Sequence, residues 1–379
     1  MVTVAVTPEA SGETRAAITP ETVKKLVGLG ATVRVVAGTA ATSGITDEAL
    51  AAAGATIVGS TPEAVGGADI LLKVRRPAPD DLKGLNAGGL VVAILAPFDD
   101  RPGLDTLAGT GASLMAMEFM PRITRAQSMD VLSSQSNLAG YKAVVDAASM
   151  LHQAMPMMMT AAGTVPASKV FIMGVGVAGL QAIATARRLG GIVSATDVRP
   201  ATKEQVASLG AKFIAVEDDE FREAQTATGY AKPMSEAYQA KQKELVAGHI
   251  KTQDIVITTA LIPGRPAPRL ITAEMVASMK PGAVIMDLAA ERGGNCELTR
   301  PGEVVEAHGV RIAGPLNLAG TMAVNASALY AKNLLNFLET MFDKKTKAFA
   351  VNWDDEIVKG TLVAKDGKIV HPSLQPKGA

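Results

Sequence analysis

Polar side chains crowd into residues 121–141, which read PRITRAQSMDVLSSQSNLAGY. The stretch holds two arginines, one aspartate, two glutamines, one asparagine and four serines, but no histidine and no cysteine. Such groups can hold a ligand by hydrogen bonds, yet none has an ordinary pKa near neutrality, as an efficient general acid or base would need. The composition therefore predicts either a solvated loop or a site that positions a ligand without moving a proton.

A glycine-rich turn in the second half of the chain carries the strongest signal for a cofactor. The apolar run KVFIM (169–173) leads directly into the sequence GVGVAG, and a helical pattern follows. Its glycines would permit a tight turn, let a pyrophosphate approach the backbone, and let the helix pack on the strand. The helix N-terminus then offers N–H groups to the phosphates. The predicted cofactor-binding residues of this turn are Gly174, Gly176, Val177, Ala178 and Gly179.

An acidic residue at the end of the next predicted strand suggests which dinucleotide binds. Asp197 follows IVSAT, eighteen residues after Gly179. A carboxylate there can accept hydrogen bonds from both adenosine ribose hydroxyls and repels a 2′-phosphate, which favours NAD(H) over NADP(H). Arg199 tempers that preference, since an arginine could accept a phosphate. We predict that Asp197, Val198 and Arg199 bind NAD(H); a Rossmann-shaped fold without a cofactor is the alternative.

Two later turns are predicted to approach the nicotinamide half of the cofactor. The segments 254–268 and 283–295 each contain a strand followed by a turn, and the second strand ends in Asp287. Ligands of open α/β sheets bind at the carboxyl ends of the strands. The predicted contacts are Thr259, Ala260 and Leu261. For Thr258 and Thr259, β-propensity alone is an equally good explanation.

Other reactive residues give weaker signals. Tyr230 lies in the Gly- and Pro-punctuated stretch 226–235, which could close over the cofactor or could be a mobile surface loop. The four histidines are scattered without metal-ligand spacing, and Cys296 has no obvious base nearby in the sequence. We therefore predict no metal site and no nucleophilic cysteine.

Length and composition bound the class of protein. A chain of 379 residues exceeds one ordinary core, and 48% hydrophobic residues with only 3% aromatics favour an α/β protein. Lys+Arg and Asp+Glu both number 37, so no basic surplus points to nucleic acid. One cysteine fits a reducing compartment, and no uninterrupted run of about 18 apolar residues could span a bilayer. We expect a cytoplasmic protein without direct membrane insertion.

Strand and helix patterns alternate along most of the chain. Residues 2–6 read as a strand and residues 19–30 as a helix, with Thr19 as its N-cap and Pro20 at its first position. Continued alternation predicts parallel sheets with helices on both faces. Further helices are predicted from 136 to about 161 and at 325–342, and a turn at Asp366-Gly367 joins two short antiparallel strands. The predicted fold is α/β, with two Rossmann-like doubly wound parallel-sheet domains, 1–138 plus 325–379 and 139–324, and a nucleotide cleft between them.

The chain resembles one known family over essentially its whole length. The matching blocks include PRITRAQSMDVLSSQSNLAGY, KVFIMGVGVAGLQAIATARRLG, GYAKPMSEAY and MDLAAERGGNCELT. They are similar to the NAD(H)-binding domain I, the alpha-1 subunit, of proton-translocating NAD(P)⁺ transhydrogenase, which is related to alanine dehydrogenase. The resemblance implies a subunit that passes hydride from NADH to NADP⁺ while partner subunits move protons across a membrane.

The resemblance also gives roles to the polar stretch at 121–141. It implies a loop that projects from the first domain over the nicotinamide, in which Gln127 reaches the nicotinamide ribose of NADP(H) on a partner domain. Arg122, Asp130 and Ser133 then orient the dihydronicotinamide of NADH. Direct hydride transfer moves no proton on either ring, so such a site needs positioning and no general base.

Partners and an alternative activity follow from the same resemblance. It implies a homodimer that binds NAD(H), meets NADP(H) on a partner domain, and attaches to the cytoplasmic face of the inner membrane through a membrane-spanning subunit. The alternative is an alanine dehydrogenase-like enzyme, whose family uses an arginine, a lysine and a histidine. Arg15 and Lys73 match two of these, but Ala96 stands at or near the histidine position and cannot do acid–base chemistry. A non-catalytic NAD sensor is a third interpretation.

Overall fold

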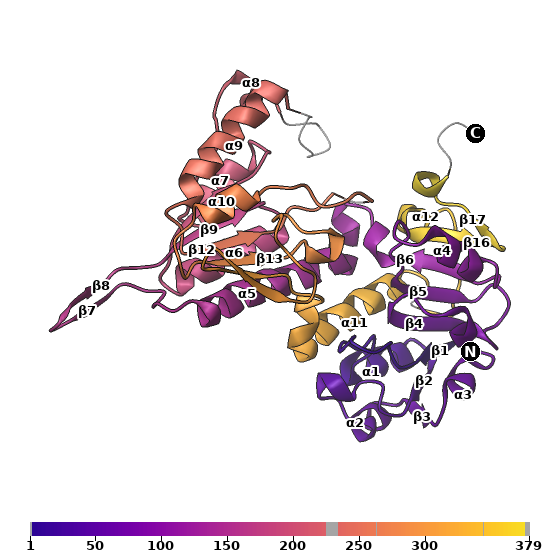
Figure 1. The fold of residues 1–379 in the computed structure, drawn as a ribbon. Coiled ribbons are helices and arrows are strands. Elements are labelled where there is room, and N and C mark those ends of the chain that lie inside the picture. The colour runs from indigo at the N-terminus through magenta and orange to yellow at the C-terminus, as the bar shows by residue number, and fades with distance from the viewer. Residues whose placement is uncertain (1, 225–233, 263, 344, 376–379) are drawn as a thin grey trace. The chain divides into compact units, whose positions relative to one another are not determined.

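The computed structural model describes residues 2–224, 234–262, 264–343 and 345–375. The chain forms two compact units, each with its own large sheet (Figure 1): unit 1 comprises residues 1–135 and 319–379, and unit 2 comprises residues 136–318. In none of the four described ranges is there a helix long and apolar enough to cross a membrane.

Unit 1 is built on an eight-stranded sheet in the order β17-β16-β6-β5-β4-β1-β2-β3, in which β1 to β6 run parallel. Its strands are β1 Thr3–Val6, β2 Thr32–Val36, β3 Thr56–Val58, β4 Ile70–Arg75, β5 Leu90–Ile94, β6 Ser113–Ala116, β16 Leu362–Lys365 and β17 Lys368–Ile369. Its helices are α1 Pro20–Gly28, α2 Asp47–Ala52, α3 Thr61–Val65, α4 Arg101–Ala108, α11 Ala323–Glu339 and α12 Glu356–Thr361.

The helices of unit 1 cover both faces of this sheet because successive strand residues point to opposite sides. Val4 and Val6 of β1 share a core with residues of α1, α2 and α11, whereas Ala5 shares a second core with residues of α3 and α4. Helix α1 begins as predicted, with Thr19 Oγ1 accepting the N–H of Thr22 and Pro20 in the first turn. Unit 1 is therefore the doubly wound layer structure that the alternation predicts.

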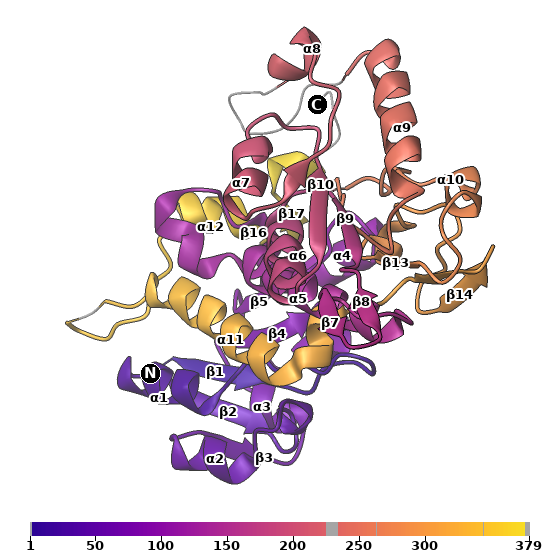
Figure 2. The ribbon, with the colours of Figure 1, turned by 90° about the vertical axis from the view of Figure 1, so that its left-hand side faces the viewer.

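Unit 2 has the same plan on a seven-stranded sheet in the order β11-β10-β9-β12-β13-β15-β14, parallel except between β14 and β15. Its strands are β9 Lys169–Met173, β10 Ile192–Thr196, β11 Lys212–Phe213, β12 Ile255–Thr258, β13 Val284–Asp287, β14 Val304–Ala307 and β15 Val310–Ala313. Its helices are α5 Val131–Met150, which begins in unit 1, α6 Val177–Arg188, α7 Thr202–Ser208, α8 Asp219–Arg222, α9 Glu236–Ile250 and α10 Ala273–Ala277. Helix α6 packs on β9 and β10 (Figure 2).

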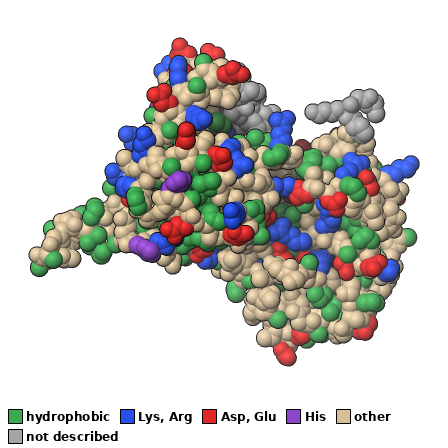
Figure 3. Space-filling view, viewed as in Figure 1, with side chains coloured by type: hydrophobic (Ala, Val, Ile, Leu, Met, Phe, Trp, Pro, Cys, Tyr) green, Lys and Arg blue, Asp and Glu red, His purple; other side chains and the backbone are tan. Residues whose placement is uncertain are grey.

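The segment predicted as one helix from 136 to about 161 is different in the structure. Helix α5 begins five residues earlier, at Val131, because Asp130 Oδ1 accepts the N–H of Ser133 and so caps the first turn. It ends at Met150, and after Pro156, which cannot continue a helix, comes a two-stranded hairpin of β7 Met158–Thr160 and β8 Gly163–Val165. Hydrophobic side chains lie exposed on this hairpin (Figure 3), among them Met159 at 80%.

The end of the chain matches its prediction. Strands β16 and β17 pair antiparallel, with Ala364 opposite Ile369 and Lys365 opposite Lys368. The two turn residues, Asp366 and Gly367, have φ of +51° and +78°, which is the combination a two-residue hairpin turn requires. This hairpin extends the sheet of unit 1 through pairing of β16 with β6.

Candidate functional site

The glycine turn of unit 2 lies where β9 ends and α6 begins. Gly174 has φ +100°, and a Cβ there would stand 2.6 Å from Thr259 Oγ1. A Cβ at Gly179 would stand 1.9 Å from the carbonyl oxygen of Gly174, so the helix could not approach the strand. At Gly176, in contrast, no atom lies within 4 Å of a Cβ. Packing thus explains two of the glycines, and the third borders open space.

That open space adjoins the N-terminus of α6. Gly176 is the N-cap residue and supplies no side chain to the first N–H groups of the helix. Gly176 and Val177 are exposed, and Ala178 is partly so. The first N–H groups of a helix lack an internal acceptor and carry partial positive charge, so this arrangement can bind an anionic group such as a phosphate.

Helix α5 packs against the glycine turn at Gly140, a residue that the sequence did not single out. A Cβ at Gly140 would lie 2.1 Å from the carbonyl oxygen of Ala178, so the two backbones touch. A glycine inside a helical pattern is the signal that could have indicated a close backbone approach. Gly140 thereby helps to fix the first turn of α6.

Asp197 binds the glycine turn directly. Its side chain, 7% exposed at the end of β10, accepts the N–H of Val175 at 2.7 Å. Arg199 donates its backbone N–H and Nε to Oδ1, at 2.9 and 2.8 Å, and its Nη2 to Oδ2 at 2.8 Å. Each carboxylate oxygen therefore already accepts two hydrogen bonds within the chain. A ribose hydroxyl that bonds to Asp197 would replace donors of Arg199.

The turn after β12 is held by three hydrogen bonds, one to Gly174 and two with Asn295. Thr259 Oγ1 donates to the carbonyl of Gly174 at 3.0 Å, and the N–H of Ala260 donates to Asn295 Oδ1 at 3.0 Å. Asn295 Nδ2 donates back to the carbonyl of Ala260 at 2.9 Å, a contact that the sequence did not indicate. Leu261 is 53% exposed and extends from this fastened backbone.

Thr258 and Asp287 are internal. Thr258 Oγ1 donates to Asp287 Oδ1 at 2.9 Å, and both residues are completely buried. Asp287 also accepts the N–H groups of Ala289 and Cys296 and the hydroxyl of Thr299. Of the two explanations for Thr258, its burial fits β-propensity, and Asp287 serves to hold the segment 289–299 in place.

Within the polar stretch, residues Thr124–Met129 form a 3-10 helix, and contacts with other parts of unit 1 hold this helix in place. Ala126 and Met129 are buried in the core beneath it. Arg125 makes a bidentate ion pair with Asp355, at 2.7 and 2.9 Å. The carbonyl of Ser128 accepts a side-chain N–H from each of two asparagines of α11, Asn333 at 2.8 Å and Asn336 at 2.9 Å.

The four residues predicted to act in this loop fall into two pairs. Asp130 and Ser133 are bonded to each other, with Ser133 N donating to Oδ1 at 2.9 Å and Ser133 Oγ to Oδ2 at 2.6 Å, and this bond caps α5. Arg122 and Gln127 are exposed, on either side of the anchored Arg125. Tyr230 falls outside the described residues.

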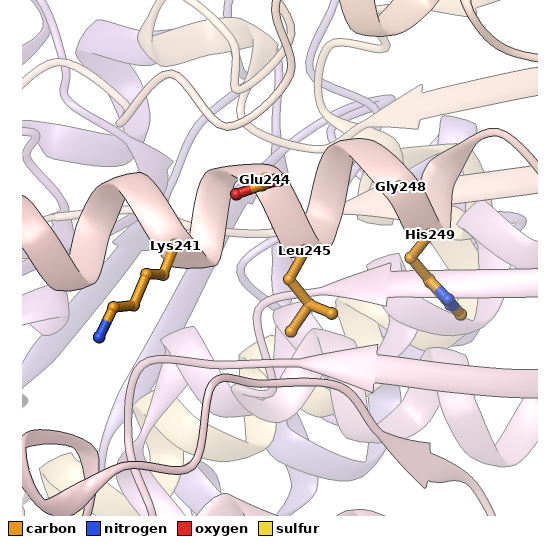
Figure 4. A pocket seen from close by; sticks show the side chains of 5 residues that line it. All are labelled: Lys241, Glu244, Leu245, Gly248 and His249. Carbon is orange, nitrogen blue, oxygen red and sulfur yellow. The ribbon is translucent and has the colours of Figure 1, made fainter.

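A shallow hollow on α9 includes none of the predicted site residues. It is lined by Lys241, Glu244, Leu245, Gly248 and His249, all on one helix (Figure 4). The imidazole of His249 is hydrogen-bonded to Ser194 Oγ at 2.8 Å, and burial, with Lys212 and Lys169 nearby, lowers its pKa. Across the described ranges, no group of three or more His, Cys, Asp or Glu is placed to hold a metal ion.

Comparisons with known proteins agree with this architecture. Residues 5–139 match the family model "Alanine dehydrogenase/PNT, N-terminal domain" and residues 143–372 match "Alanine dehydrogenase/PNT, C-terminal domain". An NAD(P) transhydrogenase alpha-subunit chain of Rhodospirillum rubrum is 55% identical over 97% of both chains. The crystal structure of transhydrogenase from Sinorhizobium meliloti is 56% identical, with a TM-score of 0.88 over 97% of this chain and 100% of that one.

Alanine dehydrogenase is a more distant relative. The enzyme of Mycobacterium tuberculosis is 32% identical over 77% of this chain and 73% of its own. The solved structures thus confirm the predicted α/β class with two Rossmann-like units, and the sequence matches favour the transhydrogenase branch. The chain belongs to the alanine dehydrogenase/PNT family, and within it to the NAD(P) transhydrogenase alpha subunits.

Proposed function

We propose that this chain binds NAD(H) and passes hydride directly from NADH to NADP⁺ held on a partner domain. In this reaction the glycine turn and α6 hold the pyrophosphate, and Asp197 with Val198 and Arg199 holds the adenosine ribose. Thr259, Ala260, Leu261 and Tyr230 contact the remainder of the cofactor. Arg122, Asp130 and Ser133 orient the dihydronicotinamide, and Gln127 reaches the nicotinamide ribose of NADP(H).

The anchored loop at 124–129 is the observation that carries this proposal. Gln127 of this loop and Arg122, two residues before it, are exposed, while Arg125, Ala126 and Met129 hold the loop backbone. Hydride transfer between two nicotinamides needs the reacting carbons at about 3–3.5 Å and no proton donor. A rigid loop with amide and guanidinium groups but no histidine suits that task.

The assembly belongs to the same proposal. We infer that a membrane-spanning subunit and an NADP(H)-binding domain complete the enzyme, that proton movement is coupled in those partners, and that the chain sits on the cytoplasmic face. We also infer a homodimer. The exposed Met158 and Met159 of the hairpin, with the exposed Met157 just before it, support an association surface, because contiguous exposed apolar side chains usually mark one.

The proposal is tested by following NADH absorbance with the purified chain. One reaction contains NADP⁺ and a purified transhydrogenase NADP(H)-binding domain; the other contains pyruvate and ammonium. Oxidation of NADH only in the first supports the proposal, and oxidation only in the second would establish an alanine dehydrogenase instead.

Gln127→Asn then tests the loop. It shortens the side chain by one methylene without changing its chemistry, so hydride transfer should slow by roughly tenfold or more, while NADH affinity stays within a factor of about two. Gln375→Asn, the same change at another exposed site of unit 1, is the matched control and should leave the rate unchanged. A large loss of NADH affinity in Gln127→Asn would contradict the assigned role.

A further inference from the structure

Helix α11 packs against the loop at 124–129 with a largely apolar face. Its Leu334 and Phe337 are completely buried in the same core as Met129 of the loop. Asn333 lies next to Leu334 and is only 7% exposed, although its side chain is polar. Burial of an amide costs free energy unless its polar atoms are bonded, so the partners of Asn333 indicate what it does.

Both polar atoms of the Asn333 side chain are hydrogen-bonded. Its Nδ2 donates to the carbonyl of Ser128 at 2.8 Å, and its Oδ1 accepts the hydroxyl of Ser134 at 2.7 Å. Asn336 donates its own Nδ2 to the same carbonyl of Ser128 at 2.9 Å. Residues three apart are neighbours on a helix surface, so the two amides of α11 converge on one oxygen of the loop.

The carbonyl that these amides hold belongs to the residue directly after Gln127. The carbonyl of Gln127 itself accepts the N–H of Asp130 at 3.4 Å, so the backbone around this side chain is bonded on the loop side as well. Ser134, the other partner of Asn333, lies in the first turn of α5. Asn333 therefore connects the backbone beside Gln127 with the start of α5 through one short side chain.

The start of α5 is bonded to α11 at a second point. Gln135 Nε2 donates to the carbonyl of Ala326 at 3.1 Å, and Gln135 is itself buried. Ala326 and Asn333 are seven residues apart, about two helical turns, so they lie on the same face of α11. The turn that contains Asp130 and Ser133 and the loop before it are thus both bonded to one helix face.

We propose that Asn333, assisted by Asn336, is a positioning residue for hydride transfer and acts through Gln127, an inference that rests on the proposed function. By fixing the carbonyl of Ser128 relative to the first turn of α5, Asn333 sets where Gln127 stands relative to the groups that orient the dihydronicotinamide. Without this bond the loop would shift on its apolar base. A misplacement of about 1 Å can slow a reaction by roughly a hundredfold without any change in chemistry.

Single-turnover kinetics tests this inference, with saturating NADH and a purified NADP(H)-binding domain that carries NADP⁺. Asn333→Ala should transfer hydride roughly tenfold more slowly than the unaltered chain, while the NADH dissociation constant stays within a factor of about two. Asn336→Ala leaves the bond of Asn333 in place and should slow transfer by roughly threefold. Because Asn336 is partly exposed, this second variant carries the test where Asn333→Ala does not fold.

A double-mutant cycle with Gln127→Ala separates positioning from general damage to the fold. Where Gln127 is already removed, Asn333→Ala should slow transfer by less than about twofold more, because the side chain that it positions is gone. The same cycle applies to Asn336→Ala. Effects that multiply in the double variant, or transfer at the unaltered rate in both asparagine variants, would overturn the inference.

The matched control is Asn86→Ala. It removes another amide of unit 1 that donates to a backbone carbonyl, that of Gly67 at 3.1 Å, and it should leave the transfer rate unchanged. An unaltered rate in Gln127→Ala would contradict the proposed role of Gln127 and overturn this inference with it. A slow Gln127→Ala beside asparagine variants of unaltered rate would overturn this inference alone and leave the proposed function standing.

Discussion

At the level of single side chains, Asp197 has two structural contacts: it bonds the glycine turn and it pairs with Arg199. Its Oδ2 fixes the glycine turn through Val175, and both oxygens neutralise Arg199. Arg199 also donates to the carbonyl of Val175 at 3.1 Å, so it links Asp197 to the glycine turn, where we propose that the adenosine ribose binds. A dinucleotide would therefore bind here by exchange of hydrogen bonds, in which Arg199 yields donors to the ribose hydroxyls.

Asp197→Ala should remove both contributions of this carboxylate. The variant loses the acceptor for ribose and the support of Val175, so NADH affinity should fall by about tenfold or more, equivalent to roughly 1.4 kcal/mol. Affinity for NADPH should rise, because the charge that repels the 2′-phosphate and neutralises Arg199 is gone. Fluorescence titration with each nucleotide measures both effects. Arg199→Ala is the companion variant, and it should weaken NADPH binding in the Asp197→Ala background.

At the level of the helices, α5 and the start of α6 are in close backbone contact at Gly140. Gly140→Ala would gain about 1 kcal/mol of helix propensity. Its Cβ, however, would stand 2.1 Å from the carbonyl oxygen of Ala178, and a backbone atom cannot move alone. Overpacking of this kind costs about 1–3 kcal/mol or more, so we expect net destabilisation and weaker NADH binding.

Gly248→Ala is the matched control for Gly140→Ala. Gly248 also lies inside a helix of unit 2, but a Cβ there would meet no atom within 4 Å. The propensity gain then acts unopposed, and stability in urea should stay equal or rise by up to about 1 kcal/mol. If both variants behave alike, the close approach at Gly140 does not fix the turn.

We expect the position of the loop at 124–129 to depend on the ion pair between Arg125 and Asp355. Arg125→Gln removes the ion pair with Asp355 but leaves Asp355 to cap α12 through the N–H of Ile357. Exposed ion pairs contribute little to stability, so the variant should fold normally. Hydride transfer should nevertheless slow by roughly tenfold, because a small displacement of the loop misplaces Gln127, while NADH affinity stays the same.

The control for this loop variant is Lys359→Gln, which removes the neighbouring exposed pair with Asp354 and should leave the rate unchanged. Single-turnover kinetics with the NADP(H)-binding domain separates the transfer step from binding. A rate equal to that of the unaltered chain would show that the ion pair does not position the loop.

The sequence predicted those features of the molecule that are encoded locally. The glycine turn, Thr19 as a helix cap, and the Asp366-Gly367 hairpin all depend on residues close together in the chain. Long-range partners left no such pattern: Asp355 meets Arg125 from 230 positions away, and Asn295 meets Ala260 from 35. Asp287 is likewise buried by contacts with Cys296 and Thr299, which follow it in the chain, and the spacing of these residues in the sequence does not indicate those contacts.

At the level of the whole molecule, each unit has its own cores, so a ligand of one unit should stabilise that unit first. The single tryptophan, Trp353, packs against a core of unit 1. Most of the proposed NAD(H) contacts, those of the glycine turn, of Asp197 and of the turn after β12, lie in unit 2, and only Arg122, Asp130 and Ser133 belong to unit 1. Circular dichroism reports on both units, and Trp353 fluorescence reports on unit 1 alone.

NAD⁺ should therefore raise the unfolding temperature seen by circular dichroism more than the one seen by Trp353. At a hundred times its dissociation constant, a ligand adds about 2.7 kcal/mol to the stability of the unit that binds it. NADP⁺ at the same concentration should give a much smaller shift, because Asp197 repels its 2′-phosphate. Equal shifts with the two nucleotides would contradict the proposed preference for NAD(H), whereas identical shifts of both signals with NAD⁺ would show that the two units unfold as one.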